Sequence, residues 1–156
     1  MKEKESVAGG CACGAIRLGF IAPTIFNAAC HCRACQYTSG GGPAYLIGAR
    51  KDQFRVTKGS PVQFMTMSDA NNAVTRAFCD KCGTHLYSWS DETPEQLSIK
   101  VGCLDDPYPF RPRLHLWTSE AQRWHKRHWF TRRFPKNAPS RFERSPGPQS
   151  GRQNSR

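Results

Sequence analysis

The chain has 156 residues, of which 38% are hydrophobic and 22% are charged, and it carries eight cysteines. Its length suits one domain with a single modest core. Membrane-spanning and exported proteins are not expected, because the longest apolar stretch, residues 18–26, is broken by Gly19 and Pro23, and the charged start lacks a signal-peptide core. We therefore expect a cytoplasmic protein, in which reduced cysteines favour metal ligation over disulfide formation.

The formal net charge of +11 is unevenly distributed along the chain. Residues 1–110 carry eleven Lys and Arg against ten Asp and Glu, whereas residues 111–156 carry twelve against two. Beyond residue 134 apolar residues become scarce, so we expect a basic, disordered tail over residues 135–156. Such a tail either attracts nucleic acid or another polyanion, or only keeps the chain soluble, because charge alone carries no specificity.

Hydrophobic patterning predicts a mostly β domain over residues 9–134, after a flexible N-terminus of residues 1–8. Alternation and short apolar runs bounded by turn residues indicate strands at residues 15–20, 25–29, 44–49, 54–56, 62–67, 74–78, 96–101 and 114–117. Residues 36–43 contain three consecutive glycines and a proline, which predicts a flexible loop. This loop follows directly on a cluster of cysteines.

The first cysteine pair, Cys11 and Cys13, lies between glycines. The two residues are too close for an unstrained disulfide, but their thiols can chelate one ion from one face of a strand. Further along, Cys79 and Cys82 form a Cys-x-x-Cys-Gly pattern typical of zinc knuckles, which needs two more ligands. We expect the four thiolates to close the shell of one structural zinc ion, which would link distant parts of the chain and stabilise the fold.

The run Cys30-His31-Cys32-Arg33-Ala34-Cys35 brings three thiols together. In an extended chain Cys30 and Cys32 point to the same side while His31 points away, and Cys32-x-x-Cys35 has metal-ligand spacing. A structural zinc site fills four positions with protein ligands, whereas a catalytic site leaves one for water or substrate. The run therefore predicts an open, catalytic metal site with Cys30, Cys32 and Cys35 as ligands, and His31 is disfavoured as a fourth.

Four further side chains have both an ordinary and a functional interpretation. Cys103 has no partner by spacing, so a small buried residue is favoured over a reactive thiol or a ligand beside the open site. His115 lies in a predicted strand, and a packed strand histidine is favoured over a metal ligand. Trp124 and Trp129 stand among basic residues. We expect them to pack the chain end onto the sheet, and stacking on bases or on a substrate is the alternative.

Four segments in this order resemble the glutathione-dependent formaldehyde-activating enzyme family, which also includes a vertebrate centromere protein. They are residues 9–14, 30–35, 78–84 and 102–105, and the resemblance spans residues 9–124. It implies a single, mostly β domain of the Mss4-like, zinc-bound fold with two zinc ions. Cys11, Cys13, Cys79 and Cys82 would hold the structural ion, and Cys30, Cys32 and Cys35 the catalytic one.

The activity implied by the resemblance joins glutathione and formaldehyde into S-(hydroxymethyl)glutathione, formally a carbon–sulfur lyase reaction in reverse. An open zinc would bind the thiol or polarise the aldehyde. Arg33 is the first candidate to offset the thiolate charge and to bind substrate carboxylates. Other thiols and aldehydes are also compatible with the sequence.

Two other functions compete with the enzyme. One is a zinc-stapled binding module whose basic tail holds nucleic acid or another polyanion. The other is a three-thiol site that takes iron–sulfur or another soft metal.

Overall fold

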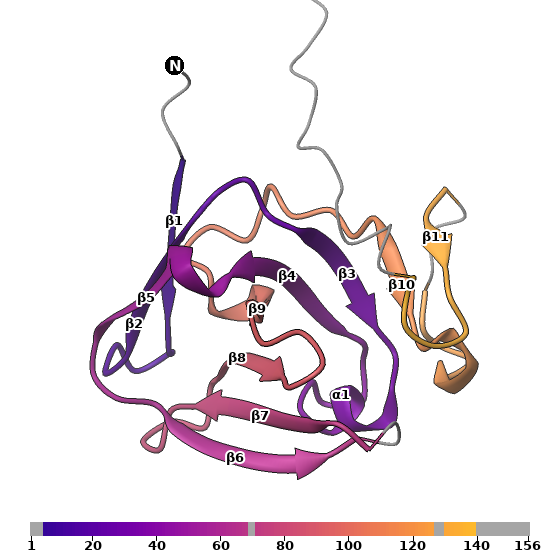
Figure 1. Cartoon of the computed structure of the whole chain (residues 1–156), viewed down its shortest axis with the longest axis horizontal. Helices are drawn as coiled ribbons and strands as arrows, with labels where there is room; N and C mark the ends of the chain where they lie inside the picture. The colour runs from indigo at the N-terminus through magenta and orange to yellow at the C-terminus, as the bar shows by residue number, and fades with distance from the viewer. Residues whose placement is uncertain (1–4, 69–70, 127–129, 140–156) are drawn as a thin grey trace, which may run out of the picture.

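A computed structural model describes residues 5–68, 71–126 and 130–139 of the chain, and Figure 1 shows that β-strands dominate it. The strands are β1 (Ser6–Gly10), β2 (Arg17–Ile21), β3 (Phe26–Cys30), β4 (Ala44–Arg50), β5 (Phe54–Lys58), β6 (Val62–Met67), β7 (Ala73–Phe78), β8 (His85–Ser90), β9 (Gln96–Lys100), β10 (Leu114–Leu116) and β11 (Arg132–Arg133). One short α-helix, α1 (Arg33–Tyr37), and three 3₁₀ turns, Lys51–Gln53, Val101–Cys103 and Thr118–Glu120, complete the described elements. The expected mostly β, single-domain fold is confirmed.

The strands form two sheets. The smaller sheet has the order β1-β2-β5, and the larger has the order β11-β10-β3-β4-β9-β8-β7-β6. Neighbouring strands are antiparallel except that β10 runs parallel to both β3 and β11. Consequently β3 is an interior strand that lies between β4 and the late strand β10 (Figure 1).

The main hydrophobic core lies between the two sheets. On β2, Leu18 and Phe20 alternate with partly exposed neighbours and are each 2% exposed. They belong to one cluster with Ile47 of β4, Leu86 of β8 and Ile99 of β9. Each fully buried side chain of this size contributes about 1.5–3 kcal/mol through the hydrophobic effect, so this cluster fixes how the sheets pack. A smaller cluster under β3 and β4 includes Cys30 and Leu46.

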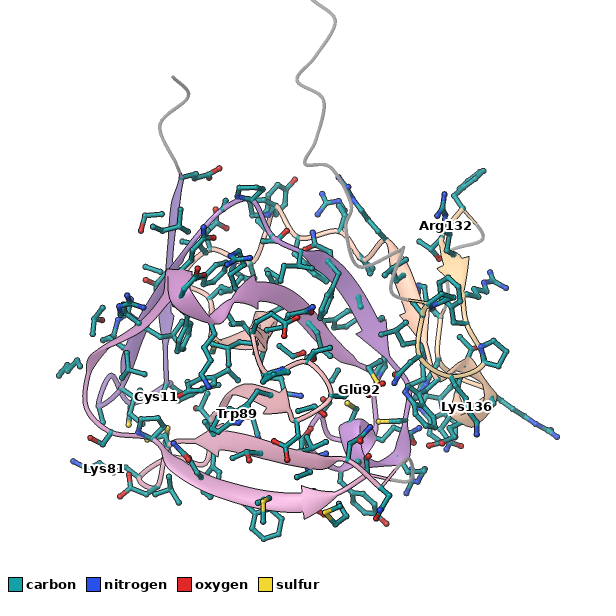
Figure 2. The ribbon with its side chains drawn as sticks, in the orientation of Figure 1. Cys11, Lys81, Trp89, Glu92, Arg132 and Lys136 are labelled. Atoms are coloured by element: carbon teal, nitrogen blue, oxygen red, sulfur yellow. The ribbon has the colours of Figure 1, made fainter. Side chains whose placement is uncertain are left out.

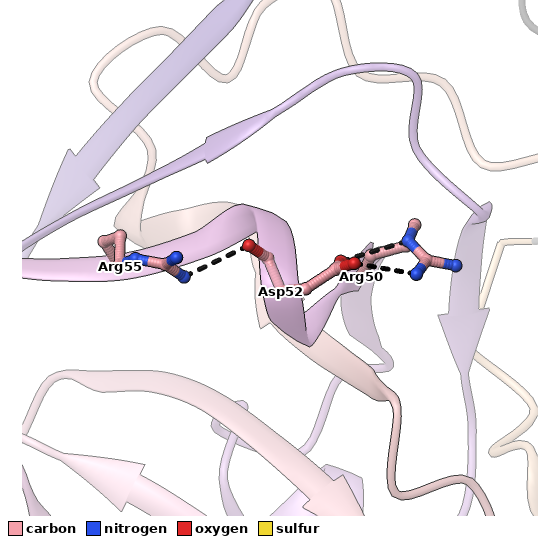
Figure 3. A network of polar contacts seen from close by, with 3 residues as sticks. All are labelled: Arg50, Asp52 and Arg55. Atoms are coloured by element: carbon pink, nitrogen blue, oxygen red, sulfur yellow. Dashed lines mark hydrogen bonds and ion pairs between the residues drawn. The ribbon is translucent and has the colours of Figure 1, made fainter.

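The two sheets are joined where β4 passes into β5. At this turn the carboxylate of Asp52 accepts hydrogen bonds from Arg50 Nε at 3.0 Å and Arg50 Nη2 at 2.8 Å, and Arg55 Nη1 donates to the Asp52 carbonyl oxygen at 3.2 Å (Figure 3). The hydrogen bonds from Arg50 lower the pKa of Asp52 below its usual value. Because these side chains are exposed, the network shapes the turn more than it stabilises the fold.

The N-terminal boundary differs from the prediction. Residues 6–8 were expected to be flexible, but they belong to β1, where Val7 pairs with Phe20 of β2. The reason is local: β1 is a short edge strand rich in glycine, so its sequence lacks the alternation that marks a strand. The strand β8 was not predicted either, although its partners β7 and β9 were.

The C-terminal segment also departs from the expected picture. The backbone N–H of Trp117 donates to the carbonyl of Lys136 at 3.1 Å, and its indole N–H donates to Asn137 at 2.7 Å, so the predicted tail is attached at its start. Trp124 is 71% exposed and does not pack onto the sheet as expected, because the buried side of that segment is occupied by His125. Trp129 and residues 140–156 lie outside the described part of the chain.

Among the described residues, no helix has both the length and the apolar character needed to cross a bilayer.

Candidate metal centres

The first cysteine cluster consists of Cys11, Cys13, Cys79 and Cys82, whose sulfur atoms all lie within 4.8 Å of one another. The sulfurs of Cys11 and Cys13 are 3.5 Å apart, and those of Cys13 and Cys79 are 3.7 Å apart. A tetrahedral ion with metal–sulfur bonds of about 2.3 Å places its ligands about 3.8 Å apart. The four thiols therefore fit one tetrahedral metal ion, as the spacing predicted.

Two tight backbone turns create this cluster. In the first, Ile16 N–H donates to the sulfur of Cys11 at 3.1 Å, at the connection between β1 and β2. In the second, Gly83 N–H donates to the Cys79 carbonyl at 2.9 Å, and Gly83 adopts a φ of +69°, a conformation that glycine tolerates best. Hydrogen bonds from Thr84 lower the pKa of the Cys82 thiol to about 6, which favours a thiolate ligand.

The second cluster consists of Cys30, Cys32 and Cys35, again with all sulfurs within 4.8 Å. Cys30 ends β3, Cys32 caps the N-terminus of α1, and Cys35 lies inside that helix. The sulfurs of Cys30 and Cys32 are 3.5 Å apart, and Cys35 N–H donates to the Cys32 sulfur at 3.4 Å. In Figure 2, sulfur atoms gather beside the labelled Cys11 and, on the opposite side of the view, beside α1, so the two clusters are separate. The second cluster offers three protein thiols, and a tetrahedral ion there keeps a fourth position.

The electrostatic surroundings of the three-cysteine cluster favour negative charge on Cys35. Hydrogen bonds with Cys30 and then Cys32 lower the pKa of Cys35 to about 3, although burial opposes them. The positive charges of Lys100 and Arg76 lower this pKa further. The register of the sheet explains part of this effect: Lys100 pairs with Leu46 and Cys30 pairs with Ala44, so both side chains lie on the same face.

A cavity of about 620 Å³ is lined by residues that follow each of the two clusters in the sequence. Its walls come from the loop after α1, from the segment after Cys82 and from the end of β9. The lining residues are Thr38, Ser39, Gly42, Pro43, Tyr45, Gly83, Thr84, His85, Lys100, Val101 and Gly102. Burial, and then the positive charges of Lys100 and Arg76, lower the pKa of His85, so its imidazole is neutral at neutral pH.

The sequence predicted Arg33 as the cation of the open site, whereas the structure brings Lys100 and Arg76 close to Cys35 and His85. Arg33 lies on the exposed side of α1, where its guanidinium donates to Gln36 and stands 4.9 Å from the centre of the Tyr37 ring. Arg33 is absent from the cavity lining, whereas Lys100 is part of it. Sequence reasoning missed Lys100 and Arg76 because strand register, and not local pattern, brings them to this face.

The remaining candidates belong to neither cysteine cluster. Cys103 is 3% exposed, and its thiol donates to the Lys100 carbonyl at 3.0 Å. Burial raises the pKa of Cys103 to about 12, so it is a protonated core thiol. His31 and His115 are also buried, and the nitrogen Nε2 of His31 lies 2.9 Å from Nδ1 of His115. Neither histidine belongs to a group that could hold a metal among the described residues.

Fold and site together define a β-sheet protein with two cysteine clusters that could each hold a metal ion, one with four thiols and one with three. The sequence profile of the family described as "Glutathione-dependent formaldehyde-activating enzyme" matches residues 6–120. This match covers well over half of the chain, so the chain belongs to that family.

One curated relative agrees with this assignment, and one solved structure agrees with the fold. A Halomonas elongata protein named "Putative glutathione-dependent formaldehyde-activating enzyme" is 28% identical over 123 residues, which are 74% of this chain and 77% of the relative. A structural-genomics crystal structure of a Rhodobacter sphaeroides protein is 22% identical, with a TM-score of 0.50, over 63% of this chain and 87% of the other. At that identity the crystal structure supports the fold alone.

Proposed function

We propose that this protein is a zinc-dependent enzyme of the carbon–sulfur lyase type. It condenses a thiol such as glutathione with formaldehyde or another aldehyde, as the family name indicates. The observation that carries the proposal is the three-cysteine cluster with an open fourth position, together with Lys100, which lines the cavity and whose positive charge acts on Cys35. A reducing, cytoplasmic compartment suits both clusters, because their ligands must remain thiolates.

The residues present fit two zinc ions per chain. Soft thiolate ligands favour zinc, and the sulfur separations in both clusters match tetrahedral coordination. Cys11, Cys13, Cys79 and Cys82 would hold a structural ion, and Cys30, Cys32 and Cys35 a catalytic one. When bound at the open site, zinc supplies Lewis acidity and favours the thiolate form of a sulfur ligand.

The chain's own residues provide the rest of the chemistry. In the reaction a sulfur–carbon bond forms, and the thiol proton ends on the former carbonyl oxygen. The neutral imidazole of His85 lines the cavity and can accept and return that proton. Lys100 and Arg76 offset the negative charge of three thiolates, and Lys100 can pair with a carboxylate of the substrate.

The proposal is tested by NMR exchange spectroscopy between free glutathione and its hydroxymethyl adduct. A sample without protein is the necessary control, because the adduct forms spontaneously. We expect the zinc-loaded protein to accelerate exchange above that background. Equal rates with and without protein would contradict the proposed activity, and the same assay with other thiols would then show whether the substrate or the reaction class is wrong.

Neutralising Lys100 is expected to weaken the binding of acidic thiols. For Lys100→Gln we expect the KM for glutathione to rise roughly tenfold, because a charged hydrogen bond contributes about 1.5–3 kcal/mol and about 1.4 kcal/mol is a tenfold change. The KM for 2-mercaptoethanol, which has no carboxylate, should change little.

Arg33→Gln is the variant to compare with Lys100→Gln, because it removes the same charge from the exposed side of α1. Arg33 is itself a proposed contact to substrate carboxylates, and the comparison measures how much each of the two cations lowers the KM for glutathione. A larger rise in KM for Arg33→Gln than for Lys100→Gln would show that the thiol lies outside the cavity.

The competing function, a module that holds polyanions, rests on the basic residues of the C-terminal part. Deleting residues 140–156 preserves the contacts of Lys136 and Asn137 with Trp117. We expect this truncation to keep the exchange activity within about twofold. Loss of activity together with loss of salt-dependent nucleic-acid binding would instead favour the binding module.

A further inference from the structure

Three buried histidines form a continuous chain directly behind the three-cysteine cluster. His31, His115 and His125 are 0%, 2% and 6% exposed. Nδ1 of His31 lies 2.9 Å from Nδ1 of His125, and Nε2 of His31 lies 2.9 Å from Nδ1 of His115. The three residues come from the end of β3, from β10 and from the segment after Thr118–Glu120. The proposed function does not use any of them.

Backbone groups determine the protonation of His125. Its Nε2 lies 2.9 Å from the carbonyl oxygen of Gly41, and a carbonyl oxygen only accepts, so Nε2 carries a hydrogen. Its Nδ1 accepts from the backbone N–H of Gln122 at 3.3 Å, so Nδ1 carries none. These bonds select the Nε2–H tautomer of His125, so the Nδ1–H of His31 must be the donor in the bond between the two rings.

His125 thus joins two parts of the site that are otherwise distinct. On one side its Nδ1 accepts a hydrogen bond from His31, which lies between Cys30 and Cys32. The backbone N–H of His31 donates to the carbonyl of Leu116 at 2.9 Å. On the other side its Nε2–H donates to the carbonyl of Gly41, a residue with a φ of +90°. The neighbouring Gly42 and Pro43 line the cavity.

A second set of polar contacts keeps His125 in place. The side-chain amide of Gln36, in α1, donates to the carbonyl of His31 at 2.6 Å and to that of Glu120 at 2.9 Å. The amide of Gln122 donates in turn to the side-chain oxygen of Gln36 at 3.1 Å. The C-terminal segment is therefore fastened to α1 independently of His125, and removal of the imidazole should leave this attachment intact.

We propose that His125 is a positioning residue that holds the glycine loop, residues 40–42, at a fixed distance from the three-cysteine cluster. Gly42 of this loop lines the cavity, so the position of the loop determines how a thiol in the cavity approaches the three-cysteine cluster. The effect on the KM for the thiol rests on the proposed function, whereas the effect of His125 on the position of the loop does not. The side chain acts through Gly41 and His31 and contacts neither substrate nor metal.

The kinetic test compares two substitutions of His125 whose side chains differ in length. The side-chain amide nitrogen of glutamine can occupy the place of Nε2 and donate to Gly41, whereas asparagine is too short to do so. We expect His125→Asn to raise the KM for glutathione roughly five- to tenfold with a smaller change in kcat, and His125→Gln to restore most of the loss. Trp124→Ala, at the exposed neighbouring position, should behave as wild type. Equal KM values for all variants, or no rescue by glutamine, would overturn the proposal.

Two readouts do not depend on catalysis. Nitrogen-15 NMR of the metal-loaded protein should show the Nε2–H form of His125 and a hydrogen on Nδ1 of His31. The amide of Gly41, which donates to the Gln36 carbonyl at 2.8 Å, should exchange with solvent about tenfold faster in His125→Asn than in wild type or His125→Gln. Unchanged exchange at Gly41 would overturn the proposal even in an active enzyme. If the histidine tautomers and the Gly41 exchange rates are as expected but the protein does not accelerate exchange of glutathione with its adduct, the proposed function is wrong and the role of His125 in positioning the loop stands.

Discussion

Replacing Cys35 with serine is expected to return the exchange between glutathione and its hydroxymethyl adduct to the rate measured without protein. Hydrogen bonds with Cys30 and Cys32 lower the pKa of Cys35 to about 3, which favours its thiolate form as a ligand. A serine hydroxyl of nearly the same size stays protonated and is a poor ligand for a soft metal ion. We expect the zinc content to fall from two ions per chain to one.

The control for this substitution is Cys103→Ala. Cys103 is also a buried cysteine, but it lies outside both clusters and is protonated. The alanine variant should keep two zinc ions and the accelerated exchange. Acceleration that survives in Cys35→Ser, or that is lost equally in Cys103→Ala, would show that the three-cysteine cluster is not the reactive centre.

Replacing Cys79 with serine is expected to destabilise the whole domain. Cys79 is 0% exposed and belongs both to the four-cysteine cluster and to the main core. The cluster connects the start of β2 with the turn before β8, and structural zinc sites of this kind contribute about 10–16 kcal/mol to the folding of small domains. We expect the free energy of unfolding in urea to fall by more than ~3 kcal/mol, because one of four ligands is lost.

The comparison for Cys79→Ser is the Cys35→Ser variant, which loses a ligand from the other cluster. Cys35 lies at the edge of the smaller hydrophobic cluster, so the same change there should lower the free energy of unfolding far less. Similar unfolding midpoints for the two variants would contradict the division into a structural and a catalytic cluster.

Much of the architecture followed from local sequence patterns. Alternation predicted β6 at its observed bounds and placed β4, β7 and β9 to within one residue at either end. Cysteine spacing paired Cys11 with Cys13 and Cys79 with Cys82, because ligand spacing is a local property. The two pairs were joined only because one tetrahedral ion needs four ligands. The helix α1 was not predicted: it has five residues, and its N-terminal cap is the sulfur of Cys32, a residue that rarely signals a helix start.

The parts that sequence reasoning missed depend on contacts between distant segments. Lys100 reaches the face of Cys30 because β9 pairs with β4 in one register, and a single-residue shift would turn it to the other face. His31 and His125 are 94 positions apart, so no spacing rule links them. The prediction of a disordered tail did not anticipate the hydrogen bonds of Lys136 and Asn137 with Trp117. These bonds join distant segments, so the composition of the tail does not reveal them.

The most direct test of the central claim is cadmium-113 NMR of the protein loaded with two cadmium ions, recorded before and after glutathione is added. Cadmium takes the place of zinc at thiolate sites, and its resonance responds to the number of sulfur ligands. We predict two resonances, of which the one that is absent in Cys35→Ser shifts on addition of glutathione while the other stays in place. If neither resonance moves, or if the resonance of the four-cysteine cluster is the one that moves, the three-cysteine cluster is not the site at which this protein engages its thiol.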